Sequence, residues 1–98
     1  MLTGAFRRRP DVLWRRSLDA VVLLPLRAED VVTLAGTGVT VWELLDTWRT
    51  VDALTDLLSL EYQADAAMVR ADLEGLIDRL DALGALELAA DSGGPARG

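Results

Sequence analysis

Residues 31–45 read VVTLAGTGVTVWELL, and the spacing of the apolar residues changes in the middle of this stretch. Val31–Leu34 is a short apolar run that stops at Gly36 and Gly38, which is typical of a strand followed by a turn. Beyond the glycines the apolar residues recur at helical spacing, at Val41, Trp42, Leu44 and Leu45. The stretch therefore predicts that a region of strands ends, and a region of helices begins, near residue 37.

Two more short strands are expected before this stretch. Asp11–Ser17 alternates its side chains between two faces, and Ala20–Leu26 is a continuous aliphatic run. Pro25 has no N–H to donate, so this end of the run lies at a sheet edge or at a strand end. Arg27–Asp30 is a polar connection of hairpin length. Together with Val31–Leu34, these runs predict an antiparallel meander of three strands.

Three helices are expected after it. Thr37 or Thr40 can cap the first helix; Thr40 has the capping-box spacing to a glutamate, whereas Thr37 gives the longer helix. Thr50 is a good N-cap for the second helix. Asp65 caps the third and longest helix, which ends at Gly84 as a left-handed residue. The third helix has the clearest periodicity, at Val69, Leu73, Leu76, Leu80 and Leu83.

These elements predict one α+β domain over residues 11–88, with a three-stranded antiparallel sheet followed by three helices. Ala85–Leu88 could add a short final strand. Residues 1–10 are expected to fray as a flexible N-terminus, in which the arginines at 7–9 form a solvated charge run. Residues 89–98, AADSGGPARG, are expected to form a disordered tail.

The composition argues against catalysis. The chain contains no His, no Cys and no Lys, which removes imidazole bases, thiol nucleophiles, Schiff-base lysines and zinc sites of the usual N/S type. The carboxylates of the third helix are spread over its solvated surface, with no second cluster to face them as acid and base or as a metal cage. We therefore expect a binding protein, not an enzyme, with no catalytic residue, metal or cofactor.

The charge distribution bears on the class of partner. The net charge is −6, and the excess of acid follows residue 40. The second and third helices resemble a helix-turn-helix, but Asp65–Gly84 carries five acids against two arginines and would be repelled by DNA phosphates. No apolar run approaches the length of a membrane helix, and no apolar segment accompanies the N-terminal arginines as in a secretory signal. We expect a cytoplasmic monomer that binds neither membrane nor nucleic acid.

One flank of the third helix stands out. Helical geometry places six of its residues together, beside Leu76 and Leu83: Met68, Ala71, Asp72, Gly75, Arg79 and Ala82. A glycine in mid-helix costs about 1 kcal/mol relative to Ala and often lets another backbone approach closely. The helix either packs against its own sheet here, or forms a shallow groove with Asp72 and Arg79 as polar handles. The residues alone leave both interpretations open.

The succession of segments resembles the PqqD-like family. The resemblance covers about residues 10–88, and its most specific part is the turn Gly36-Thr37-Gly38 followed by the Trp-Glu-Leu-Leu helix of residues 42–45. The resemblance implies a winged-helix-like fold that recognises precursor peptides of ribosomally made, post-translationally modified peptides. In the family, the leader segment of the precursor peptide docks as an extra strand on the edge of the third strand, over a groove shared with the third helix.

Carried onto this sequence, the receiving edge is Val31, Val32, Thr33 and Leu34, and the groove wall is Met68, Asp72, Gly75, Leu76, Arg79 and Leu83. The partners implied are a leader peptide and a separate leader peptidase or modifying enzyme. We favour a lasso-peptide leader protease, whose leaders resemble a Tyr-x-x-Pro pattern suited to an apolar pocket near Leu76 and Leu83. The alternatives are an adaptor for a radical-SAM pathway of the quinone-cofactor type, a winged-helix DNA-binding regulator, and a structural subunit of a larger complex.

Overall fold

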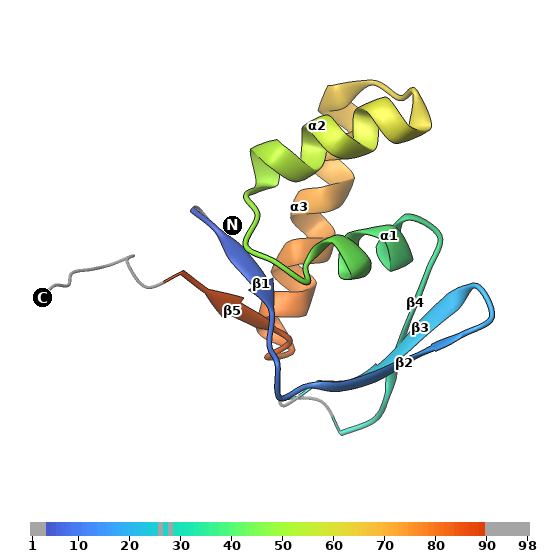
Figure 1. Ribbon diagram of the computed structural model, residues 1–98, viewed down its shortest axis with the longest axis vertical. Coiled ribbons are helices and arrows are strands. Elements are labelled where there is room, and N and C mark those ends of the chain that lie inside the picture. The colour runs from blue at the N-terminus through green and yellow to red at the C-terminus, as the bar shows by residue number, and fades with distance from the viewer. Residues whose placement is uncertain (1–3, 26, 28, 90–98) are drawn as a thin grey trace, which may run out of the picture.

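The computed structural model describes residues 4–25, 27 and 29–89. Its elements follow one another as β1 (Phe6–Arg8), β2 (Leu13–Ser17), β3 (Ala20–Leu24), β4 (Val32–Ala35), α1 (Thr37–Leu44), α2 (Val51–Tyr62), α3 (Ala66–Ala82) and β5 (Leu86–Leu88). The antiparallel sheet β2–β3–β4 is followed by the three helices, as the sequence predicts (Figure 1). The predicted α+β class is confirmed.

β3 is the central strand of this sheet, and β4 is an edge strand. Ser17 and Ala20 are register partners across a two-residue turn, so they exchange both backbone hydrogen bonds. Because a strand's bonding direction alternates from residue to residue, Val21 and Leu23 of β3 then bond to β4. The register pairs these two residues with Leu34 and Val32.

Three of the four predicted helix ends lie where the sequence places them: Thr50, Asp65 and Gly84. Asp65 is the N-cap residue of α3, but its side chain makes no capping hydrogen bond. The Thr50 hydroxyl accepts a hydrogen bond of 3.1 Å from the backbone N–H of Ala53 at the start of α2. Gly84 has a φ of 77°, and the amides after α3 return to the last turn in the pattern of a Schellman motif. The first helix is different: neither threonine caps it, because its N-cap is Gly36, which has a φ of 58°.

The expectation of a frayed N-terminus is wrong for the described part of residues 1–10. β1 pairs antiparallel with β5, and the Phe6 side chain is completely buried. On its other side β1 bonds to the segment after α1, through Phe6 N to Arg49 O at 2.8 Å and Arg8 N to Leu45 O at 3.0 Å. The final strand expected at residues 85–88 is thus present as β5. Of the expected disordered tail, residues 90–98 lie outside the described residues.

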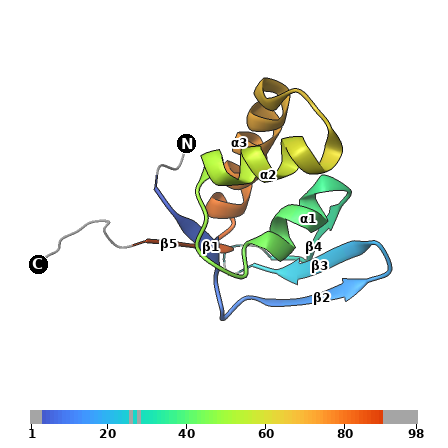
Figure 2. The same cartoon turned by 45° about the horizontal axis from the view of Figure 1, so that its top comes forward.

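The hydrophobic core lies between the helices and the inner face of the sheet. Figure 2 shows α1 lying against one face of β2–β3–β4, while α2 and α3 pack together beyond it. Trp42 from α1, Leu54 from α2 and Ile77 from α3 are all fully buried. Trp42 also meets Trp14 of β2 edge to face, with ring centroids 6.1 Å apart. Leu34 of β4 belongs to the same buried cluster as Ile77, so the core connects β4 with α3.

Candidate peptide-binding groove

The outer edge of β4 has no strand partner among the described residues. Since Val32 and Leu34 bond to β3, the backbone N–H and C=O groups of Thr33 and Ala35 point out of the sheet edge. Within the described part of the chain, no backbone hydrogen bond connects Val32–Ala35 to an element other than β3. The edge also lacks the charged side chains and prolines that usually block such edges.

β4 and α3 run in opposite directions with their neighbouring ends tied together. Before β4, the Arg27 amide donates a 2.9 Å hydrogen bond to the Leu83 carbonyl at the end of α3. After β4, Thr37 lines a pocket together with Met68 and Asp72 from the first half of α3. The free edge of β4 therefore lies beside the flank of α3 predicted from helical geometry.

That flank is open. Met68, Asp72, Gly75 and Arg79 are all exposed, and Met68 retains 67% of its surface. Apart from the backbone of its own helix, a Cβ built at Gly75 would meet no atom of the described residues within 4 Å, so their packing does not require a glycine there. The sequence left two interpretations of this flank open: packing against the chain's own sheet, or an open groove. At Gly75 the flank is exposed, so the first interpretation is wrong there. Leu76 and Leu83 are half-buried at the inner border.

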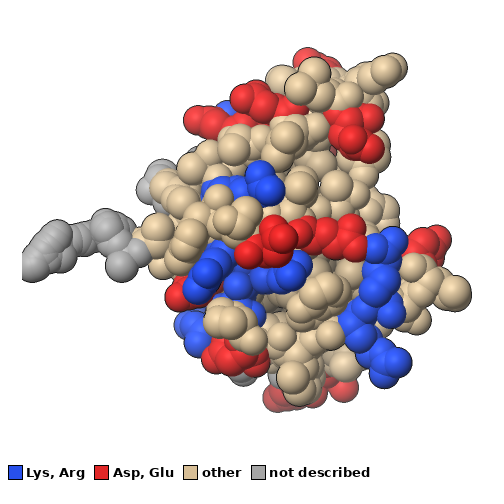
Figure 3. Space-filling view, viewed as in Figure 1, with Lys and Arg blue, Asp and Glu red and all other residues tan. Residues whose placement is uncertain are grey.

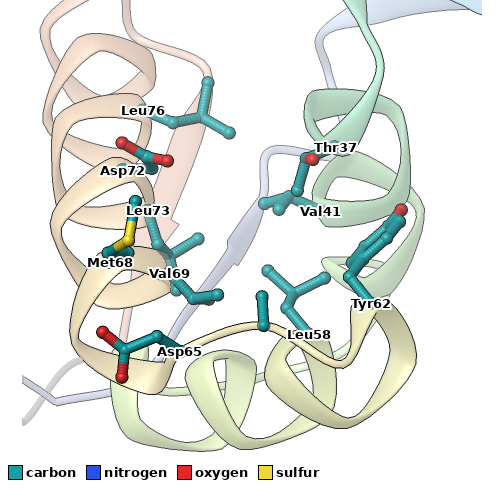
Figure 4. A pocket seen from close by; sticks show the side chains of 11 residues that line it. Thr37, Val41, Leu58, Tyr62, Asp65, Met68, Val69, Asp72, Leu73 and Leu76 are labelled. Carbon is teal, nitrogen blue, oxygen red and sulfur yellow. The ribbon is translucent and has the colours of Figure 1, made fainter.

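An apolar pocket of about 260 Å³ opens between α3 and the helices opposite (Figure 4). Seven apolar residues line it: Val41, Leu58, Ala64, Met68, Val69, Leu73 and Leu76. Four polar residues complete the lining: Thr37, Tyr62, Asp65 and Asp72. The volume falls just below the roughly 300–1,000 Å³ of small-molecule sites, so it suits one large side chain of a bound chain.

The walls of the pocket come from three helices. Tyr62, at the end of α2, forms a hydrogen bond of 2.7 Å between its hydroxyl and the Thr40 hydroxyl of α1. This bond joins α1 to α2 on the side of the pocket opposite Met68 (Figure 4). Asp65, Asp72 and Arg79 make no ion pair and no side-chain hydrogen bond with another described residue. Their charges are available to a bound molecule.

The structure brings together part of the predicted site. Met68, Asp72 and Leu76 line the pocket, whereas Gly75, Arg79 and Leu83 lie on α3 outside its lining, and the β4 residues form the neighbouring edge. The sequence reasoning missed the contributions of α1 and α2, such as Thr37 and Tyr62. The only sequence signal for these contributions is that Tyr62 lies at the end of a helix. That position does not show which residues of α3 it faces.

The N-terminal arginines do not form the solvated run that the sequence predicts. Arg7 donates a 2.9 Å hydrogen bond to Glu87 and lies over the Trp48 ring, and Arg8 donates to the Trp42 carbonyl at 2.9 Å. Arg9 makes two hydrogen bonds of 3.0 Å to the Asp11 carboxylate, which holds the pKa of Asp11 below its usual value. In the view of Figure 3 arginines gather over β1 and β2, and acidic side chains lie over the far ends of α2 and α3.

The described residues contain neither a cluster of metal-ligating side chains nor a helix that could span a membrane. No group of three or more acidic residues among them could hold a metal ion. No helix within this part of the chain is long and apolar enough to cross a membrane. The arrangement offers a strand edge, an apolar pocket and a few exposed charges, which together suit an extended peptide.

Comparisons with known proteins agree with this geometry. The sequence profile of a family described as coenzyme PQQ synthesis protein D (PqqD) matches residues 20–86. Among solved structures, the chain is similar to TbiB1 in complex with the TbiA(beta) leader peptide. The TM-score is 0.73 and the sequence identity 28%, over 87% of this chain and 99% of that chain. A search of curated proteins finds no match.

Proposed function

The chain belongs to the PqqD family, and we propose that it binds the leader segment of a ribosomally synthesised precursor peptide and presents it to a separate enzyme. The leader adds a strand to the free edge of β4, in the groove against α3. Main-chain hydrogen bonds to β4 give the leader its register, and the pocket selects its side chains. This role needs no catalytic group, metal or cofactor.

The observation that carries the proposal is the outward-facing backbone of Thr33 and Ala35 beside an open helix flank. A free strand edge of this kind invites pairing with another chain, and proteins usually block it. Here the edge is uncharged and lies next to an apolar pocket of side-chain size. The likeness to TbiB1, a structure that holds a leader peptide, supports the same occupant for this chain.

The enzyme served is a finer part of the proposal. Free-standing members of the family that the chain resembles occur with both types of enzyme. We favour a lasso-peptide leader protease over a radical-SAM maturase because of the Arg-, Leu- and Ala-rich composition. A leader tyrosine would enter the pocket beside Leu76, which lines it, and not beside Leu83, which does not. We also propose that the protein acts as a cytoplasmic monomer.

Substitution at Thr33 tests the docking edge. Thr33→Pro removes an N–H that faces the edge and leaves the hydrogen bonds of Val32 and Leu34 to β3 in place. In a titration of a labelled leader peptide from the same gene neighbourhood, we expect affinity to fall at least tenfold. Thr33→Val keeps the N–H and should bind like the natural chain, and circular dichroism should show both variants folded. Equal affinities for the two variants would place the docking edge elsewhere.

A winged-helix DNA-binding regulator is the competing function. Its recognition helix would be α3, whose five acids between Asp65 and Gly84 outnumber its two arginines. Phosphate contacts supply most non-specific DNA affinity, so this helix would repel the backbone. A gel shift with bulk DNA at low salt distinguishes the two functions: we expect no shift, and a salt-sensitive shift would favour the regulator.

A further inference from the structure

Along the groove, negative side chains lie at the pocket and a positive side chain lies further along α3. Asp65 and Asp72 both line the pocket, and Met68 lies between them on the same face of α3 (Figure 4). Neither carboxylate has an ion-pair partner among the described residues. The lining of the pocket contains no cation. A side chain that enters this pocket therefore meets an apolar floor with negative charge at its rim.

Arg79 supplies the opposite charge further along the same flank. It follows Asp72 by seven residues, which is about two helical turns, so both side chains share one face and lie about 10 Å apart along the axis. Arg79 is exposed and likewise has no ion-pair partner among the described residues. Because α3 and β4 run in opposite directions, Arg79 near the end of α3 lies beside β4. Asp72, earlier in α3, lies at the pocket.

An extended peptide advances about 3.3 Å per residue, so the separation of Asp72 and Arg79 corresponds to about three residues of an added strand. We propose that the recognised segment of the leader is charge-ordered: a large apolar residue with a basic neighbour at the pocket, and an acidic residue about three positions away. This inference rests on the proposed function and names the class of leader that the groove selects. Exposed charge pairs contribute little individually, so the order acts chiefly on selectivity.

The test does not require the natural leader to be identified. A displayed library of random 16-residue peptides is selected on the purified full chain, and the consensus peptide is synthesised with its basic and acidic residues in the selected order and exchanged. We expect selected peptides to show the basic, apolar and acidic residues at the stated spacing. By fluorescence anisotropy, the exchanged peptide should bind roughly tenfold more weakly.

A double substitution that keeps the net charge gives the decisive comparison. Asp72→Arg combined with Arg79→Asp should reverse the preference, so that the exchanged peptide binds more tightly. The matched control is Asp19→Arg combined with Arg15→Asp on the β2–β3 hairpin, which should leave the preference as in the natural chain. Circular dichroism and urea unfolding verify that each variant is folded.

The outcomes separate the two claims. This inference would be overturned if the selected peptides lacked the charge order. It would also be overturned if the natural chain and the Asp72–Arg79 double variant preferred the same peptide. Either result would leave the proposed function standing. A failure to select any peptide from the library would contradict the proposed function as well.

Discussion

β1 and β4 are both short strands, but β1 is hydrogen-bonded along both of its edges and β4 along only one. β1 is bonded on both sides, to β5 and to the segment containing Leu45 and Arg49. The three arginines that begin in this strand each have a specific partner: Glu87, the Trp42 carbonyl and Asp11. β4 is bonded on one side, and the charges of the neighbouring helix flank have no partner among the described residues.

The difference separates structural residues from residues free to bind. Charges that stabilise the fold are paired and packed on aromatic rings, as Arg7 is on Trp48 at 4.6 Å. On the flank of α3, the helix-destabilising Gly75 occupies a position where the packing of the described residues leaves room for a side chain. An exposed strand edge, open space and unpaired charges therefore occur together beside β4.

The largest effect is expected from disrupting the β1 region. Phe6→Ala removes a completely buried aromatic side chain and should lower the free energy of unfolding by about 3–5 kcal/mol, measured by urea denaturation. Leu18→Ala, at a residue that is 93% exposed, is the control and should stay within about 0.5 kcal/mol of the natural chain. A loss below about 1 kcal/mol for Phe6→Ala would show that β1 contributes little to the fold.

A smaller effect of opposite sign is expected in the open region. Gly75→Ala should raise the free energy of unfolding by about 0.5–1 kcal/mol, because the new methyl group meets open space and Ala is the better helix former. The same change at Gly84 should destabilise, since its φ is positive and a Cβ there would lie 3.1 Å from the Arg27 side chain. Destabilisation by Gly75→Ala would mean that this flank is more tightly packed than the structure indicates.

The smallest effect concerns the Arg9–Asp11 pair. The Arg9 guanidinium lowers the pKa of Asp11, so the pair adds to stability above the ordinary carboxyl range and the contribution disappears as the pH falls through the lowered pKa. NMR titration of the Asp11 carboxyl should give a pKa below its usual value, and Arg9→Gln should raise that pKa. Leader affinity at neutral pH should not change, because the pair lies away from the groove. An unshifted Asp11 pKa in the natural chain would contradict the hydrogen-bonded geometry.

The parts of the fold that depend on local sequence were predictable. Thr50 and Gly84 end helices through contacts within a few residues, and the change of period after Gly36 separates strands from helices. β1 was not predictable, because one apolar residue among arginines gives no alternation. Its partner β5 is about eighty residues away, in a register that pairs Phe6 with Leu88.

The candidate site divides in the same way. Met68, Asp72 and Leu76 share a flank by helical geometry alone, so the sequence predicted them and the pocket contains them. Thr37 and Tyr62 enter the pocket through the packing of α1 and α2 against α3, which no single helix pattern encodes. Thr37 was expected as a possible cap, and the positive φ of Gly36 performs the turn instead.

Amide hydrogen exchange with and without a saturating leader peptide tests the added strand most directly. The account predicts that the amides of Thr33 and Ala35, which face the open edge, exchange much more slowly in the complex. The amides of Val32 and Leu34 already bond to β3 and should change less. Exchange of Thr33 and Ala35 at the same rate in the saturated complex as in the free protein would contradict the claim that the leader binds as a strand on β4.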